Sequence, residues 1–219
     1  MVHQDLSDRL LTTMLASDRT EAATLIGEAL DAGIPPLQVI SDILDPALVL
    51  LGHRWEQETL SLAQGFVAAK IAEDIMLRCM PESSPQPPKG VVVIGNIEDD
   101  FHSLGRRIVT LFLTAAGWEV HDLGNDVPAE QFIDTALAVG AQVVAASAMM
   151  QTTALNIRKL RELLDTRGLQ QRIKLGVGGA VFNWRPELVA EVGGDGTARN
   201  AVGADELCTR LQAAAQAGG

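Results

Sequence analysis

The pattern of hydrophobic and polar positions changes character at about residue 90. Before that point, apolar residues recur at steps of three and four, as in Leu6, Leu10 and Met14, which is the spacing of helices with one buried face. After it, short apolar runs alternate with helical patterns. The chain is therefore predicted to contain an all-α region followed by an α/β region.

The first region is predicted to form four helices. Gly33, followed by two prolines, separates the second helix from the third. The third continues through Pro46 to about Gly52, and the spacing of Ser61 and Gln64 is that of a capping box opening a fourth helix. Four helices joined by short connections favour an all-α four-helix bundle.

The second region is predicted to form a doubly wound parallel sheet of five strands. Its expected strands cover residues 90–95, 119–123, 142–146 and 173–177, with a weaker fifth strand near Gly196. Helical patterns begin near residues 102, 128, 153 and 204. Strands that alternate with helices in this way are typical of parallel α/β sheets.

A proline-rich segment separates the two regions. Residues 85–88 contain three prolines, which favour neither helix nor strand. We therefore predict a helical domain at 1–80, a linker at 81–89 and an α/β domain at 90–219.

Composition narrows the classes of partner. Hydrophobic residues make up 47% of the chain, and the net charge of -11 disfavours nucleic acid and anionic membrane surfaces. Tyrosine is absent, so stacking platforms for single strands are scarce. Cys79 and Cys208 form no metal-binding pair, and no secretion signal or membrane span is evident, so we expect a cytoplasmic protein.

Candidate chemistry gathers where the first, third and fourth predicted strands end. In doubly wound sheets, ligands bind outside the carboxyl ends of the strands. Residues 96–105 follow the first strand, residues 147–152 the third, and Gly178 and Gly179 the fourth. We expect these three segments to meet at one edge of the sheet.

Three short motifs lie in these segments: DxHxxG beginning at Asp100, SxM beginning at Ser147, and a glycine pair at Gly178. Together they resemble the flavodoxin-like cobalamin-binding domain of methionine synthase and of the small corrinoid proteins of methyltransferase systems. The likeness covers residues 5 to 210, and the helical region resembles the cap domain of those proteins. It implies a bound cobalamin, as methylcobalamin or another corrinoid.

The resemblance also implies roles for individual residues. His102 would be the lower ligand of the cobalt, Asp100 would orient its imidazole, and Ser147 would contact the cofactor's displaced benzimidazole. Trp55 and Leu62 would cover the upper face. The full set of expected cofactor contacts is Trp55, Leu62, Asp99, Asp100, Phe101, His102, Ser103, Leu104, Gly105, Ser147, Met149, Gln151, Gly178, Gly179 and Gly196.

Two observations qualify this interpretation. Many relatives carry aspartate directly after the histidine, whereas this chain has Ser103. The acidic run from Glu98 to Asp100 also suggests the magnesium site of a phospho-receiver domain. Such a domain needs an aspartate where the third strand ends, and residues 146–148 read Ala-Ser-Ala, which excludes it.

Three functions are compatible with a bound cobalamin. We favour a methyl carrier, not catalytic alone, that works with separate methyltransferase chains and a reductive activase. A light-responsive sensor is the alternative, although Gly65 and Phe66 stand where such sensors carry Glu-His. A mutase small subunit would have little use for a helical cap. The methyl donor and acceptor, the upper ligand and homodimer formation stay open.

Overall fold

The computed structural model describes residues 2–57, 59–79 and 87–218, with the side chains of Val2, Trp55, Glu56 and Leu62 left out of that description. The chain forms two compact units, residues 1–82 and 83–219, which are described separately below. Most of the predicted linker, residues 81–86, lies outside the described residues. Its end, residues 87–89, has neither helix nor strand.

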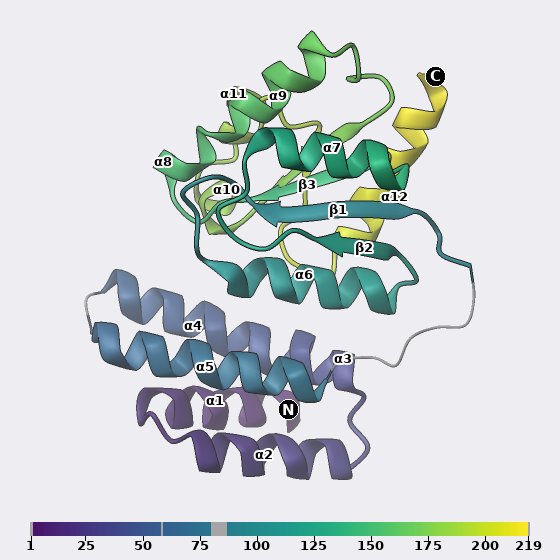
Figure 1. The fold of residues 1–219 in the computed structure, drawn as a ribbon. Helices are drawn as coiled ribbons and strands as arrows, with labels where there is room; N and C mark the ends of the chain where they lie inside the picture. Colours follow the sequence, from purple (N-terminus) through teal and green to yellow (C-terminus); the bar gives the residue numbers. More distant parts are fainter. Residues whose placement is uncertain (1, 58, 80–86, 219) are drawn as a thin grey trace. The chain divides into compact units, whose positions relative to one another are not determined.

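The first unit is a bundle of helices (Figure 1). Leu10, Met14, Ile26, Ile40 and Ile71 are among its fully buried side chains, so the periodic apolar positions do form its core. This confirms the all-α domain expected from the sequence. The helical segments are α1 (Val2–Leu15), α2 (Arg19–Asp31), α3 (Pro36–Gln38), the π-helix η1 (Val39–Leu44), α4 (Asp45–Glu56) and α5 (Leu62–Arg78).

The predicted third helix is continuous in the chain but changes type along its length. It passes from α3 through the π-helical η1 into α4, and the Asp45 N–H donates to the Ile40 carbonyl, five residues back. Pro46 follows directly. A proline has no N–H and its ring clashes with the carbonyl four residues before it. The wider π-turn, which the periodicity did not predict, relieves that conflict.

Helix α5 begins with the capping box that the sequence predicts. The Ser61 side chain accepts from the Gln64 N–H, and the Gln64 side chain accepts from the Ser61 N–H. The helix has 17 residues. Within the described part of the chain, no helix is long and apolar enough to cross a membrane.

The second unit is built on a parallel sheet with the strand order β2-β1-β3-β4-β5. All five strands lie within about two residues of their predicted positions. The doubly wound α/β fold class is thereby confirmed. The strands are β1 (Val91–Asn96), β2 (Glu119–Asp122), β3 (Val143–Ser147), β4 (Lys174–Gly178) and β5 (Gly196–Thr197).

Helices cover both faces of this sheet (Figure 1). Val93 of β1 packs in a core with Phe132 and Leu160 from α7 and α9, whereas its neighbour Val92 packs with Leu113 and Leu211 from α6 and α12. Alternate residues of β1 thus serve opposite faces. The long helices are α6 (Ser103–Ala115), α7 (Ala129–Val139), α9 (Ile157–Thr166) and α12 (Ala204–Ala217).

Three shorter helices complete the unit: α8 (Gln151–Ala154), α10 (Ala180–Trp184) and α11 (Leu188–Glu191). The single helix expected to begin near residue 153 is therefore divided between α8 and α9. The division falls at Leu155 and Asn156, where the Asn156 side chain donates to the Glu98 carbonyl at 3.0 Å. This contact ties the start of α9 to the loop after β1.

Candidate functional site

The three strand ends singled out in the sequence meet in one row. Asn96, the last residue of β1, pairs in register with Ser147, the last residue of β3. Ser147 in turn pairs with Gly178, the last residue of β4. The loops that follow these residues therefore start side by side at the carboxyl edge of the sheet, which is the ligand-binding edge of this fold.

Asp100 is the centre of this edge. Its side chain is fully buried, and its Oδ1 accepts from Asn96 Nδ2 at 2.8 Å and from the His102 N–H at 2.9 Å. Its Oδ2 accepts from the Met149 N–H and from Thr153 Oγ1, both at 2.8 Å. These four hydrogen bonds tie the loop after β1 to the loop after β3 through one carboxylate.

The same hydrogen bonds determine the charge state of Asp100. Burial alone raises the pKa of a carboxyl group, but the bonds from Met149, His102, Thr153 and Asn96 outweigh it and hold the pKa of Asp100 below its ordinary value. Asp100 is therefore a charged carboxylate at neutral pH. A buried anion with a fixed orientation is well suited to orient a neighbouring imidazole.

His102 stands next to this anion and faces outward. It is the N-cap residue of α6, and its side chain is 50% exposed. Its Nδ1 lies 3.4 Å from Asp100 Oδ1. A proton on Nδ1 would be drawn to the carboxylate, which leaves the lone pair of Nε2 free for a metal. The pair predicted from the sequence is thus brought together.

Small residues leave room beside the row. A Cβ atom added to Gly105 or Gly178 would meet nothing within 4 Å. Gly179 has a φ of +115°, and a Cβ there would lie 1.9 Å from the Ala148 carbonyl oxygen, so only glycine fits. Gly196 differs, because a Cβ there would meet Leu207 and Arg210 of α12; its predicted cofactor contact stays a prediction.

Apolar side chains are exposed on the loops after β1 and β3, which Asp100 joins. Phe101 is 65% exposed, and Met149 and Met150 are 38% and 47% exposed. Exposed apolar groups beside an outward-facing imidazole suit a large, mostly apolar ring system. Together with the open space at Gly105 and Gly178, this donor set fits a corrinoid whose metal meets His102 and whose tail enters the sheet edge.

The remaining predicted contacts fall into two groups. Ser103 and Leu104 begin α6 partly buried, Gln151 begins α8 exposed, and Ser147 is partly buried in the row itself. Trp55 lies in α4 and Leu62 is the first residue of α5, but their side chains lie outside what the structure describes. Their predicted place over the cofactor remains a prediction.

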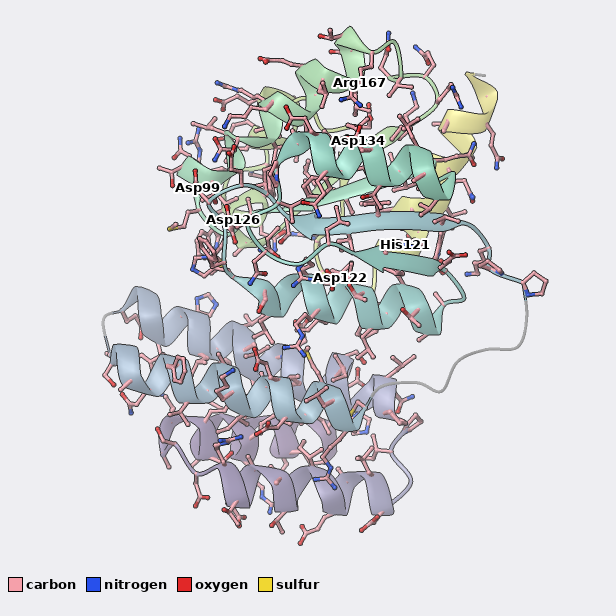
Figure 2. All side chains as sticks on the ribbon, in the orientation of Figure 1. Asp99, His121, Asp122, Asp126, Asp134 and Arg167 are labelled. Carbon is pink, nitrogen blue, oxygen red and sulfur yellow. The ribbon has the colours of Figure 1, made fainter. Side chains whose placement is uncertain are left out.

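Asp99 is directed toward the loop after β2. Its N–H donates to Asp126 Oδ1 at 2.8 Å, and its carboxylate accepts from Asn156 Nδ2 at 3.3 Å (Figure 2). Among the described residues, no three histidine, cysteine, aspartate or glutamate side chains are grouped to hold a metal ion. The acidic run at Glu98 to Asp100 is therefore no such group in the described structure.

Three residues at the site were given no role by sequence reasoning: Asn96, Arg106 and Thr153. All three are buried and all three bond within the site. No sequence signal marks Arg106, because a buried arginine in a predicted helix looks like a surface arginine. Nothing in the local sequence shows that Thr153 reaches Asp100, 53 residues earlier.

Comparisons with known proteins identify the family of both units. Residues 90–204 match the family described as B12 binding domain, and residues 6–79 match a second family with the same description. Trimethylamine corrinoid protein 1 of Methanosarcina acetivorans is 36% identical over 184 residues, which cover 81% of this chain and 85% of the relative. Monomethylamine corrinoid protein 1 of Methanosarcina mazei is 31% identical over 218 residues, covering 96% and 99%.

A solved structure gives the same result. The monomethylamine corrinoid protein of Methanosarcina barkeri has a TM-score of 0.84 and 28% identity, with 95% of this chain and 99% of that chain covered. The resemblance and the cofactor predicted from the motifs are confirmed. The chain therefore belongs to the B12-binding family of corrinoid proteins, and cobalamin is its cofactor.

Proposed function

We propose that this protein carries a methyl group between separate methyltransferase chains on a corrinoid held by His102 as the lower cobalt ligand. The observation that carries the proposal is the buried Asp100 carboxylate, fixed by four hydrogen bonds, with the half-exposed His102 imidazole 3.4 Å away. A bound corrinoid supplies a metal centre that takes a methyl group from a donor and gives it to an acceptor.

The residues of the chain would hold and tune that centre. Asp100 keeps the imidazole of His102 oriented and its Nδ1 proton in place, so that Nε2 is the ligating atom. The open space at Gly105 and Gly178 would receive the tail of the cofactor.

The relatives indicate where to look for the donor. They are named for trimethylamine and monomethylamine, so methylamines are the class to test first. We infer that the methyltransferases, and a reductase that returns the metal to its reactive state, are separate chains. The names of these relatives favour the carrier over the light-responsive sensor.

Reconstitution with methylcobalamin tests the ligand assignment. The full chain and His102→Ala are incubated with methylcobalamin, freed of excess cofactor, and compared by visible absorption at equal loading. We expect one equivalent bound by the wild type, with an absorption band that changes when His102 is removed. His121→Ala is the matched control, because His121 pairs with Glu119 on β2 away from the row.

Two results would count against the proposal. If His102→Ala and the wild type bind methylcobalamin with identical spectra, His102 is not the ligand. If the loaded wild type neither gains a methyl group from a methylamine nor gives one up when methyltransferases of the methylamine class are supplied, the carrier role is wrong. Loss of the methyl group on illumination with a lasting change of oligomeric state would instead support the sensor.

A further inference from the structure

A second set of buried polar groups lies behind Asp100. Asn96 is fully buried, and its Nδ2 donates to Asp100 Oδ1 at 2.8 Å and to the His102 carbonyl at 3.2 Å. Its Oδ1 accepts from Arg106 Nε at 2.7 Å. One amide group therefore contacts the carboxylate, the backbone of His102 and a guanidinium.

Arg106 connects Asn96, at the end of β1, to the end of β2 and the loop that follows it. It projects from the first turn of α6, and its side chain is only 6% exposed. Besides Asn96, its NH1 donates to Asp122 at the end of β2 and its NH2 to Asn125 Oδ1 at 3.2 Å. All three nitrogens of one guanidinium are thereby used, each on a different residue.

The last residue of β2 and the loop after it, residues 122–126 (the β2 loop), are thus bonded to the loop that carries His102. The Asn96 N–H donates to the Gly124 carbonyl at 2.9 Å, and the Asp126 N–H donates to the Asp100 carbonyl at 3.1 Å. Asp99 and Asp126, which contact each other, have positive φ values of 68° and 56°. Such values are costly outside glycine, so surrounding contacts must hold both residues in place.

We propose that Asn96 and Arg106 are positioning residues, through which the loop at 122–126 sets the orientation of Asp100 and His102 and hence the strength of the lower-ligand bond. The proposal rests on the proposed function of His102. The proposal goes further, because residues 122–126 contain no predicted cofactor contact. It states that these residues nevertheless affect how strongly His102 binds the metal.

The chemistry of the two side chains supports this role. A buried amide that lost one partner would leave a polar group unpaired, so the network has one favourable arrangement. Lysine could not replace Arg106, because a single ammonium cannot span Asn96, Asp122 and Asn125 together. The position of the β2 loop is therefore transmitted by a rigid planar group.

The test compares arginine-to-lysine changes at two places. Arg106→Lys and Arg167→Lys chains are loaded with methylcobalamin, and the ratio of histidine-ligated to unligated cofactor is read from the visible spectrum at neutral pH. Arg167 contacts Asp134, away from the row (Figure 2), so its variant controls for the chemical change. Thermal unfolding shows that each variant is folded.

We expect Arg106→Lys to bind cobalamin, but its ratio of histidine-ligated to unligated cofactor should be about three- to tenfold lower than that of the wild type. A change of this size corresponds to one or two lost hydrogen bonds. Arg167→Lys should stay within about twofold of the wild type. In an Asp100→Asn background the effect of Arg106→Lys should shrink to about twofold or less, because Arg106 then has no carboxylate to position beside His102. A general loss of packing would lower the ratio equally in both backgrounds.

Asn125→Ala covers the case in which Arg106→Lys does not fold. It removes only the exposed end of the network, and we expect a shift of up to about threefold in the same direction. An unchanged ratio in every folded variant of the network overturns the inference. His102→Ala, run alongside, separates the two claims: if its spectrum matches the wild type, the ligand assignment itself has failed.

Discussion

The two units bury polar side chains in different ways. Among the described residues, the helical unit buries Ser7 and Thr13, whereas the α/β unit buries Asn96, Asp100, Arg106 and Thr153. The Thr13 hydroxyl donates to the Leu10 carbonyl three residues earlier in the same helix, and the Ser7 hydroxyl has no partner in the described structure. The four buried polar residues of the α/β unit instead form one connected network.

The two groups of buried polar side chains differ in what their hydrogen bonds connect. A hydroxyl that bonds within its own helix costs little to keep and does nothing for distant residues. A carboxylate, an amide and a guanidinium in the interior are costly unless every partner is present. Their concentration at one edge of one sheet marks the place where the fold gives up stability for function.

One buried cysteine in each unit allows the units to be measured separately. Cys79 ends α5 in the helical unit, and burial raises the pKa of its thiol. Burial, followed by the charge of Asp205, raises the pKa of Cys208 in α12 to about 12. Neither thiol should react with iodoacetamide until its own unit opens, so reactivity during urea titration reports each unit independently.

The largest expected effect is that of Asp100→Ala. The change removes the one buried acceptor that Asn96, Thr153 and two backbone N–H groups share. We expect the free energy of unfolding of the α/β unit to fall by about 3–5 kcal/mol, the range for breaking a buried charged network. Cys208 should become reactive at lower urea while Cys79 does not. A loss below about 1 kcal/mol would contradict the central place given to Asp100.

Next comes the glycine pair that follows β4. Gly179→Ala forces a Cβ onto the Ala148 carbonyl at a left-handed φ, and should cost the α/β unit about 3 kcal/mol. Gly178→Ala, its matched control, meets open space and should change stability by no more than about 0.5 kcal/mol. If the cofactor tail passes there, Gly178→Ala should nevertheless weaken cobalamin binding, which equilibrium dialysis measures.

Acid should weaken the α/β unit through Asp100. Because its pKa in the folded state is below the ordinary value, its stabilising contribution is complete above the unfolded pKa, about 3.9, and is lost as pH falls through the lower folded pKa. Asp100→Asn removes this contribution. As the pH is lowered below 4, the variant should therefore lose less stability than the wild type. The fluorescence of Trp118 and Trp184, the tryptophans of the α/β unit, follows the unfolding of this unit. Equal acid sensitivity would place the titrating group elsewhere.

A smaller effect is expected in the helical unit. Ser61→Ala removes one half of the capping box at the start of α5 and should lower the stability of this unit by about 1 kcal/mol. Cys79 should respond and Cys208 should not. A matching response from both thiols would show that the two units unfold together.

Ser7→Ala should have the smallest effect. The buried Ser7 hydroxyl has no partner in the described structure, so its removal should change stability by less than about 0.5 kcal/mol, or raise it. Urea titration followed by Cys79 measures the change. A decrease of more than about 1 kcal/mol in the free energy of unfolding would indicate that this hydroxyl has a partner. The two units would then differ less in how they bury polar side chains.

Sequence reasoning reached the fold because the patterns were strong. The run Val91–Ile94 can be little other than a buried strand, and strands separated by helices leave few arrangements for the sheet. The π-turn before Pro46 was missed, because the apolar positions Ile40, Ile43, Ala47 and Leu51 keep steps of three and four through it. The break between α8 and α9 depends on Asn156 reaching a carbonyl 58 residues earlier, which no local pattern shows.

The site was predicted only as far as motifs and strand ends extend. His102 and Asp100 are neighbours in sequence, so their proximity was accessible. The contacts from Thr153 and Arg106 depend on how two loops and α6 meet in space, and a buried arginine looks like a surface arginine in a sequence. The sequence therefore predicted that Asp100 and His102 lie together, but not the side chains that hold Asp100 in place.

The row formed by Asn96, Ser147 and Gly178 has a consequence for how such a protein changes during evolution. Each of the three is the last residue of its strand, so helices and loops between them can gain or lose residues without moving the row. A deletion inside β1, β3 or β4 would instead shift one member and turn its neighbours to the opposite face. The outer surface can thus gain or lose residues while the register of the row stays the same.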